Sequence, residues 1–234
     1  ASCLPNEAEK GIDLGLLVGQ NKVNKFLSDN KDVIFENTDV IIDFTVPEAS
    51  LYHAEAASEK GIPIVIGTTG INEKEFSKLK EFSKKIPIVY SANFSIGITV
   101  MEGIIDDAVK KLGENWDIEV LETHHNKKVD SPSGTALLIG NAAAKARNKD
   151  LNDVMVTARN GMVGERKKTE IGFAVLRGGD VVGEHSIRFY NENERLEFNH
   201  VATNRSIFAN GAIRSAIWAF NSSSGFYNLK DVIK

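Results

Sequence analysis

The stretch from residue 120 to residue 140 holds the densest set of chemically useful side chains in the sequence. Two adjacent histidines, His124 and His125, are followed by Lys128 and by a Ser-Gly-Thr turn that opens an apolar, small-residue helix. A histidine titrates near neutrality and can act as acid or base, and a lysine brings a positive charge and a transferable proton. The free amides at a helix start attract an anion such as a carboxylate. The stretch therefore indicates a site that binds a carboxylate-bearing substrate and protonates it.

Three other interpretations of this stretch use fewer of its residues. The histidines and Asp130 could ligate a metal ion, but adjacent residues of an extended segment point to opposite sides, so we expect no metal site. Ser133 could be a nucleophile, but the nucleophile-elbow pattern is missing around it. A solvated polar loop rarely places two histidines beside a helix cap. The interpretation that uses every part puts the anion site at Ser133, Gly134 and Thr135.

Short apolar runs alternate with helical patterns in the first half of the chain. Residues 39–45 are nearly continuously apolar and β-branched, as in a buried strand. Pro47 then opens a helix that Gly61 ends, which is the usual placement of proline and glycine. Short connections between such elements predict right-handed crossovers and a parallel sheet. The predicted elements are strands at 39–45, 62–67 and 86–91 and helices at 48–60 and 72–84.

Small, polar and aromatic residues follow each of these three strands. In parallel α/β sheets, ligands bind beyond the carboxyl ends of the strands. Glycine lets a flat ligand approach the backbone, threonine and asparagine offer hydrogen bonds, and phenylalanine can pack against a heterocycle. Ordinary turns explain each segment alone, but three in succession favour a nucleotide site. The candidate cofactor-binding residues are Phe44, Gly67, Thr68, Thr69, Ser91, Ala92, Asn93 and Phe94.

The glycine-rich turn that binds a dinucleotide pyrophosphate is missing from the sequence. Such a turn lies between the first strand and the first helix of the fold. Gly11, Gly15 and Gly19 are evenly spaced, but no strand precedes them. We therefore do not expect them to bind phosphate. We expect the sequence either to begin after the first strand, helix and second strand of a dinucleotide-binding half or to have lost the phosphate-binding turn.

The pattern changes after residue 96, where polar and apolar residues begin to alternate. Such alternation predicts an antiparallel or mixed sheet with one exposed face. The sequence thus predicts an α/β protein, with a Rossmann-like parallel sheet that lacks its N-terminal part and a C-terminal α+β domain with a mixed or antiparallel sheet. The predicted strands lie at 116–122, 154–159, 169–177, 185–190 and 195–202, and the predicted helices at 97–112, 135–147 and 206–220.

Composition excludes several classes of partner. A net charge of −4, with basic residues scattered along the chain, argues against nucleic-acid binding. No apolar run reaches the roughly 18 residues that span a bilayer. A single cysteine, Cys3, rules out an intramolecular disulfide and fits a reducing compartment. We expect a cytoplasmic protein whose partner is a small molecule.

Residues 122–136, Glu-Thr-His-His-Asn-Lys-Lys-Val-Asp-Ser-Pro-Ser-Gly-Thr-Ala, closely resemble the signature of the 4-hydroxy-tetrahydrodipicolinate reductase (dihydrodipicolinate reductase) family. These enzymes act in lysine and diaminopimelate biosynthesis. The resemblance covers almost the whole chain in order. Further motifs that are similar to the family lie at 43–48, 67–70, 91–97, 177–185, 208–212 and 225–233.

The resemblance implies specific roles. His124 would be the catalytic acid/base and Lys128 the proton donor, while His125 and the 133–135 turn would hold the carboxylates of a cyclic dicarboxylate substrate. NADPH or NADH would bind a domain formed by residues 1–95 and 205–234. Residues 96–204 would bind substrate and assemble a homotetramer. The preference between the two nucleotides stays open, because residues near Cys3 carry neither of the charges that the family often places there.

Two other functions remain open from the sequence. One is a dicarboxylate- or nucleotide-binding relative without turnover, which the missing glycine-rich turn supports. The other is a different two-domain nicotinamide dehydrogenase that acts on an amino or imino acid.

Overall fold

The computed structural model describes residues 1–234, except for the side chain of Lys31. The chain forms two compact units, each with its own sheet. Unit 1 comprises Ala1–Ala92 and Ala212–Val232, and unit 2 comprises Asn93–Gly211 and Ile233–Lys234. The predicted combination of a parallel sheet with a second, mixed sheet is confirmed.

The sheet of unit 1 is parallel throughout and contains the three predicted strands in chain order. A fourth strand, close to the C-terminus, lies beside the third and was not predicted. Its sequence, Gly-Phe-Tyr, lacks the run of β-branched residues that marks the first two strands. The order is β1 (Ile41–Asp43), β2 (Ile64–Ile66), β3 (Pro87–Tyr90) and β9 (Gly225–Tyr227).

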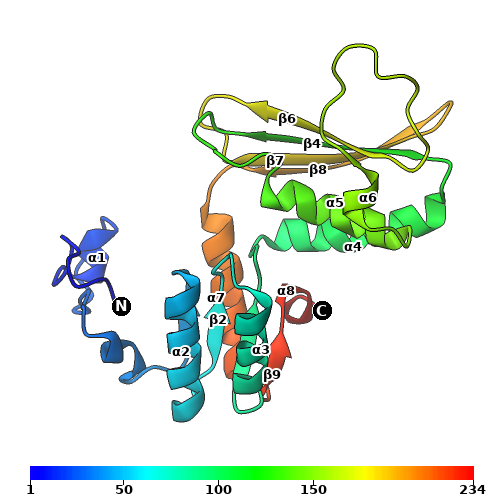
Figure 1. Ribbon diagram of the computed structural model, residues 1–234. Helices are drawn as coiled ribbons and strands as arrows, with labels where there is room; N and C mark the ends of the chain where they lie inside the picture. The colour runs from blue at the N-terminus through cyan, green and yellow to red at the C-terminus, as the bar shows by residue number, and fades with distance from the viewer. The chain divides into compact units, whose positions relative to one another are not determined.

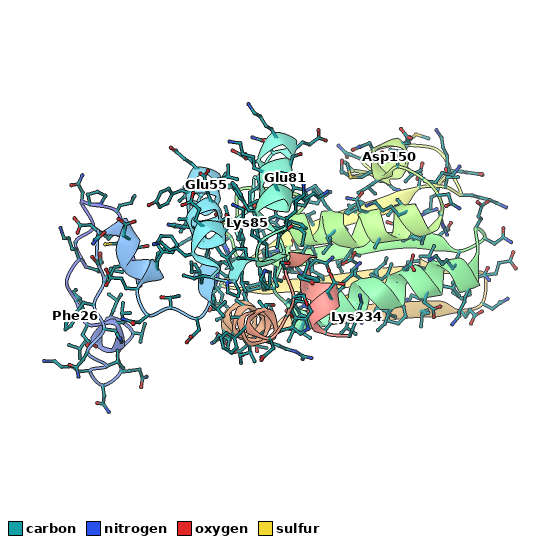
Figure 2. The ribbon with its side chains drawn as sticks, turned by 90° about the horizontal axis from the view of Figure 1, so that it is seen from below. Phe26, Glu55, Glu81, Lys85, Asp150 and Lys234 are labelled. Atoms are coloured by element: carbon teal, nitrogen blue, oxygen red, sulfur yellow. The ribbon has the colours of Figure 1, made fainter. Side chains whose placement is uncertain are left out.

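Helices α2 (Pro47–Lys60) and α3 (Glu73–Phe82) lie where the sequence predicts helices, although α3 ends at Phe82, two residues before the predicted end. Helix α2 starts with proline and ends at Gly61, whose φ of 71° favours glycine. Helix α3 starts at a capping box formed by Asn72 and Glu75. Figure 1 shows both helices alongside the strands, and Figure 2 labels Glu55 of α2 and Glu81 of α3, which are both exposed. Unit 1 also contains α7 (Ser206–Phe220) from Ala212 onward and α8 (Leu229–Val232).

The N-terminal segment forms the short helix α1 (Leu14–Leu17) and the 3-10 helix η1 (Lys31–Phe35). The buried carboxylate of Asp13 accepts hydrogen bonds from the amides of Gly15 (2.9 Å) and Val23 (3.0 Å). The amide of Gly15, the middle glycine of the evenly spaced triplet Gly11, Gly15 and Gly19, is therefore already bonded to a carboxylate of the chain itself.

Unit 2 is built on a five-stranded mixed sheet. Strand β4 runs parallel to β6 on one side and antiparallel to β7 on the other. The predicted strand at 154–159 is wrong in length, because only two of its residues pair before the chain leaves the sheet. The strand order is β5 (Met155–Val156), β6 (Ile171–Arg177), β4 (Asp117–His124), β7 (Gly183–Tyr190) and β8 (Arg195–Ala202).

Two helices cover one face of this sheet (Figure 1). They are α4 (Ile96–Leu112) and α5 (Gly134–Ala146), and the short α6 (Leu151–Val154) follows them. Along β4 every second residue is buried, beginning with the apolar Ile118 and Val120 and ending with Glu122 and His124. The covered face therefore changes from an apolar core to a pair of ionisable side chains at the end of the strand.

Among the described residues, no helix is both long and apolar enough to cross a membrane. Within the same residues, no three histidine, cysteine, aspartate or glutamate side chains are grouped so that they could hold a metal ion.

Candidate active site

A hydrogen-bonded pair of ionisable groups lies at the end of β4. The Nδ1 atom of His124 is 2.5 Å from Oε2 of Glu122, and both side chains are buried. Residues two apart on a strand share a face, which is why the two groups meet. An ionised carboxylate only accepts hydrogen bonds, so Nδ1 carries the proton and Nε2 is the ring nitrogen that can exchange one with a ligand. This is the arrangement of a general acid/base and the group that orients it.

Glu122 has further hydrogen-bond donors that keep it ionised. Arg177 donates from Nη1 to Oε2 (2.8 Å) and from Nη2 to Oε1 (3.0 Å), and the amide of Ser133 donates to Oε1 (2.9 Å). Burial alone raises the pKa of the Glu122 carboxyl, but hydrogen bonds from Arg177, His124 and Ser133 outweigh it and hold the pKa below its usual value. At neutral pH the site thus contains a buried negative charge, the Glu122 carboxylate, in contact with Nδ1 of His124.

Lys128 lies on the loop that follows β4. Its Nζ donates to Oδ1 of Asp130 (2.7 Å), and its side chain is only 19% exposed. The hydrogen bond from Lys128 is the main reason why the pKa of Asp130 is lowered. The ammonium group is therefore held in place close to the histidine strand. His125, also on this loop, is partly exposed.

A second histidine, His185, packs against the first. Its ring makes an edge-to-face contact with the ring of His124, at 5.0 Å between centroids. Burial, and then the positive charge that His124 can carry, lower the pKa of His185 to about 4. His185 is therefore neutral at neutral pH, and its Nε2 lies 3.1 Å from the hydroxyl of Ser133. It supports the turn before α5 and is not a proton donor to substrate at that pH.

The predicted anion site lies at the N-terminus of α5. Ser133 caps the helix, because its hydroxyl accepts from the amide of Ala136 (3.1 Å). Since Ser133 is buried and its amide binds Glu122, its polar groups are used within the protein. Gly134 and Thr135 occupy the first helical positions, where amides have no partner within the helix. Asn93 donates to the hydroxyl of Thr135 (3.0 Å). Carboxylate binding at this end would use the amides of Gly134 and Thr135.

A buried polar network lies at the ends of β1 and β2 in unit 1. Asp43 accepts from the amide of Thr45 (3.0 Å) and from the hydroxyls of Ser50 (3.1 Å) and Thr68 (3.2 Å), and its Oδ2 is 2.6 Å from Nδ1 of His53. Burial raises the pKa of Asp43, but the hydrogen bonds from His53, Thr45 and Ser50 together lower it. Only 3% of Thr68 is exposed, so its hydroxyl belongs to this network and its backbone alone could meet a ligand.

The other predicted cofactor residues differ in their accessibility. The ring of Phe44 is 51% exposed and lies over Gly67, where an added Cβ atom would come within 2.3 Å of it. Only glycine at position 67 allows this close approach. Thr69 and Ala92 are exposed and Ser91 is partly exposed. In unit 2, Asn93 is partly exposed, whereas the ring of Phe94 is buried at 1% exposure and is closed to a heterocycle.

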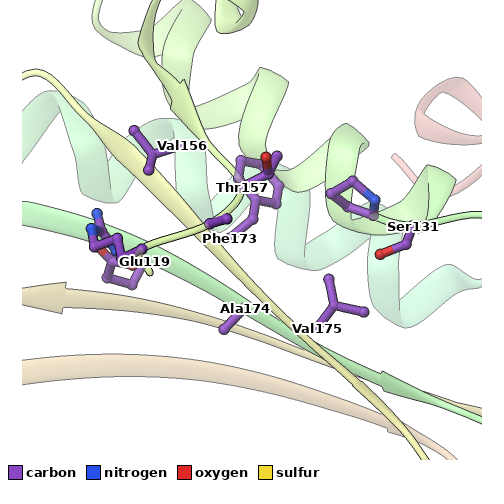
Figure 3. A pocket seen from close by; sticks show the side chains of 10 residues that line it. Glu119, Ser131, Val156, Thr157, Phe173, Ala174 and Val175 are labelled. Carbon is purple, nitrogen blue, oxygen red and sulfur yellow. Dashed lines mark hydrogen bonds and ion pairs between the residues drawn. The ribbon is translucent and has the colours of Figure 1, made fainter. Parts of the chain in front are cut away.

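A pocket of about 590 Å³ lies elsewhere on unit 2. Figure 3 shows Glu119 at one end of it and Ser131 at the other, with Val175 of β6 along its side. Neither His124 nor Lys128 lines it. The pocket is therefore distinct from the candidate active site.

Comparisons with known proteins agree with this geometry. Residues 3–94 match the family described as "Dihydrodipicolinate reductase, N-terminus", and residues 97–233 match "Dihydrodipicolinate reductase, C-terminus". The chain belongs to the dihydrodipicolinate reductase family. Among curated relatives named 4-hydroxy-tetrahydrodipicolinate reductase, that of Bartonella bacilliformis is 45% identical over 96% of this chain and 84% of its own length. That of Bartonella quintana is 47% identical over 94% and 82%, respectively.

Solved structures support the fold. A dihydrodipicolinate reductase from Paenisporosarcina, described as bound to dipicolinate, has a TM-score of 0.71 at 20% identity, covering 97% of this chain and 86% of that one. An amine dehydrogenase from Mycobacterium smegmatis has a TM-score of 0.54 at 10% identity, covering 98% and 87%. At these identities the likeness concerns the fold alone.

Three residues around His124 in this dihydrodipicolinate reductase family member were given no role from the sequence. They are Glu122, Arg177 and His185. Glu122 was detectable, because an acidic residue two positions before a histidine on an alternating strand shares its face. Arg177 and His185 were not, because their proximity depends on the strand order β6-β4-β7. Sequence spacing does not reveal that order.

Gly183, at the start of β7, lies against the catalytic candidate. A Cβ atom at this position would be 3.0 Å from Nε2 and 3.4 Å from Cδ2 of His124. We expect Gly183→Ala to displace the imidazole and to lower kcat about tenfold, because small misplacements of reacting groups are costly. Steady-state kinetics measure this effect. Gly103→Ala is the control, since a Cβ atom there meets nothing within 4 Å. Equal kcat values for the two variants would contradict the claim that a Cβ atom at position 183 displaces a catalytic His124.

Proposed function

We propose that this protein reduces 4-hydroxy-tetrahydrodipicolinate to tetrahydrodipicolinate in lysine and diaminopimelate biosynthesis. Substrate, one hydride and one proton give tetrahydrodipicolinate and one water, and NADPH or NADH becomes NADP⁺ or NAD⁺. The hydride adds to the substrate ring, and the ring hydroxyl leaves as water. The observation that carries the proposal is the buried Glu122–His124 pair beside Lys128, within a chain that belongs to the reductase family.

The strand ends of unit 1 fit a nicotinamide nucleotide. Bound there, NADPH or NADH would supply the hydride. Gly67 lets the ring of Phe44 lie directly against the backbone, and the half-exposed Phe44 ring suits stacking with a flat heterocycle. The proposed contacts are Phe44, the backbone from Gly67 to Thr69, Ser91, Ala92, Asn93 and the backbone of Phe94. Residues 1–95 and 205–234 would form the nucleotide-binding domain. The preference between NADPH and NADH is an outcome of the assay below.

The residues of unit 2 would bind and protonate the substrate. A carboxylate at the N-terminus of α5 would be held by the amides of Gly134 and Thr135, with Ser133 fixing the turn. Partly exposed His125 would bind the substrate beside it. His124 would exchange a proton through Nε2, and Lys128 would donate one from its ammonium group. Residues 96–204 would form this substrate-binding domain.

We extend the proposal to the setting of the enzyme. The family resemblance implies a homotetramer assembled through the sheet of unit 2. A single cysteine fits a cytoplasmic location. The proposed partner is a small cyclic dicarboxylate and not a nucleic acid.

The proposal is tested by following NADPH and NADH absorbance with the full-length protein and freshly generated 4-hydroxy-tetrahydrodipicolinate. We expect substrate-dependent oxidation, with one proton consumed per nucleotide oxidised, measured by a pH indicator in weak buffer. The ratio of kcat/KM for the two nucleotides gives the cofactor preference. If folded protein binds nucleotide but oxidises none, the protein is a binding relative without turnover. Oxidation with amino or imino acids instead would indicate a different dehydrogenase.

A further inference from the structure

Arg177, the last residue of β6, contacts both the carboxylate that binds His124 and the loop that carries Lys128. In the parallel pairing of β4 and β6 it lies opposite His124. Its guanidinium donates two hydrogen bonds to the Glu122 carboxylate, at 2.8 and 3.0 Å, in the planar fork geometry that suits arginine and carboxylate. Arg177 therefore fixes the Glu122 carboxylate, which in turn orients His124.

The same guanidinium also reaches the loop that carries the lysine. Nη2 donates to the backbone carbonyl of Asp130 at 2.9 Å, and the side chain of Asp130 accepts from Nζ of Lys128 at 2.7 Å. Hydrogen bonds thus link His124 to Glu122, Glu122 to Arg177 and Arg177 to the backbone of Asp130, whose side chain binds Lys128. One guanidinium therefore binds both the carboxylate of Glu122 and the backbone carbonyl of Asp130, the residue whose side chain binds Lys128.

The turn after Arg177 adds backbone contacts to the same loop. The amide of Gly178 donates to the carbonyl of His124 (2.9 Å), and the amide of Asn126 donates to the carbonyl of Gly179 (3.2 Å). The loop from β4 to α5 is therefore fastened at its start by the turn and at Asp130 by the Arg177 side chain.

We propose that Arg177 is a positioning residue that fixes His124 and Lys128 relative to each other through Glu122 and Asp130. This inference rests on the proposed function for its meaning in catalysis, but the contacts themselves do not. Lysine cannot replace arginine here, because one ammonium group does not present the two parallel N–H bonds that Glu122 accepts together with a third to Asp130. Charge alone is then insufficient, and geometry is the property that Arg177 contributes.

The same strand provides a matched control. Arg159 forms an equivalent fork with Glu119, at 3.0 and 2.9 Å. Glu119 and Glu122 are three residues apart on β4, so they lie on opposite faces of the sheet. Arg159→Lys and Arg177→Lys therefore make the same chemical change to an arginine–carboxylate fork, although Glu119 is partly exposed and also accepts from Arg166. Only the second change affects the face that holds His124.

The experiment compares both variants with wild type in steady-state kinetics and in NMR of selectively labelled histidine rings. The chain holds five histidines, so His124→Gln assigns its signal by omission. We expect Arg177→Lys to lower kcat about tenfold with little change in nucleotide KM, and to shift the His124 ring signal. Arg159→Lys is expected to leave kcat within about twofold and the His124 signal unmoved. Melting curves establish that both variants are folded.

Equal kcat losses in the two variants, or an unmoved His124 signal in folded Arg177→Lys, would overturn the inference. The NMR arm needs no turnover. Absence of NAD(P)H oxidation in wild type would reject the proposed reaction, whereas the ring signals would still decide whether Arg177 positions His124.

Discussion

His124→Gln and Lys128→Ala are each expected to lower kcat by about 100-fold or more, as the loss of a positioned acid or base does. Glutamine can still donate a hydrogen bond to Glu122, so the buried carboxylate keeps a partner while the transferable proton is lost. Lys128→Ala removes the ammonium group that Asp130 holds at 2.7 Å. Since neither residue lies in unit 1, nucleotide affinity should change little. Initial rates and nucleotide titrations measure the two effects separately.

Lys127 provides the control for the lysine variant. It neighbours Lys128 on the same loop but is exposed. Lys127→Ala should therefore leave kcat within about twofold, as exposed substitutions usually do. If His124→Gln and Lys128→Ala both turn over at the wild-type rate, the acid/base chemistry belongs to other residues and the proposed roles are wrong.

Glu122→Gln is expected to lower kcat on the order of 100-fold without removing any group that touches substrate. The amide can present its NH₂ group to Nδ1 of His124, which favours the other ring tautomer and places the proton on Nε2. It also leaves Arg177 with a neutral partner, which should reduce the free energy of unfolding by about 1–3 kcal/mol. Glu119→Gln is the control, because Glu119 is also bound by arginines but lies on the other face of β4. A comparable loss of kcat in Glu119→Gln would mean that the effect is general to the sheet.

The pH dependence of stability follows from the same carboxylate. The pKa of Glu122 is lower in the folded protein than its usual value of about 4.3, so its ionisation stabilises the fold above that pH. This contribution is lost as the pH falls through the folded-state pKa. The difference in unfolding free energy between wild type and Glu122→Gln should therefore be largest near neutrality and shrink under acid, as denaturant titrations at several pH values would measure.

The sequence predicted those parts of the fold that local patterns determine. Proline, glycine and capping residues set the bounds of α2 and α3, and the apolar runs set β1 to β3. The pairing of β9 with β3 was missed, because Gly225–Tyr227 pairs with a strand that lies far away in the sequence. The run at 154–159 alternates like a strand, but Arg159 instead extends to Glu119, and pairing ends at Val156.

For the candidate site, residue types identified the chemical groups but not their partners. Thr68 and Ser133 were expected to face ligands, yet their hydroxyls are bound within the protein by Asp43 and His185. Phe94 was expected to meet a heterocycle but is buried. A polar or aromatic residue at a strand end has the same sequence signal whether it faces a ligand or supports one that does. Burial, which depends on the tertiary fold, separates these cases.

The central claim is that Glu122 acts through His124 to move the proton that accompanies the hydride. A double-mutant cycle of Glu122→Gln and His124→Gln tests it most directly, with kcat measured for wild type, both single variants and the double variant. If Glu122 only orients His124, the double variant should be no slower than His124→Gln, within about twofold, because residues that act as a unit are not additive. If the two losses multiply, so that the double variant falls a further 100-fold or so below His124→Gln, Glu122 has a separate role and the account is contradicted.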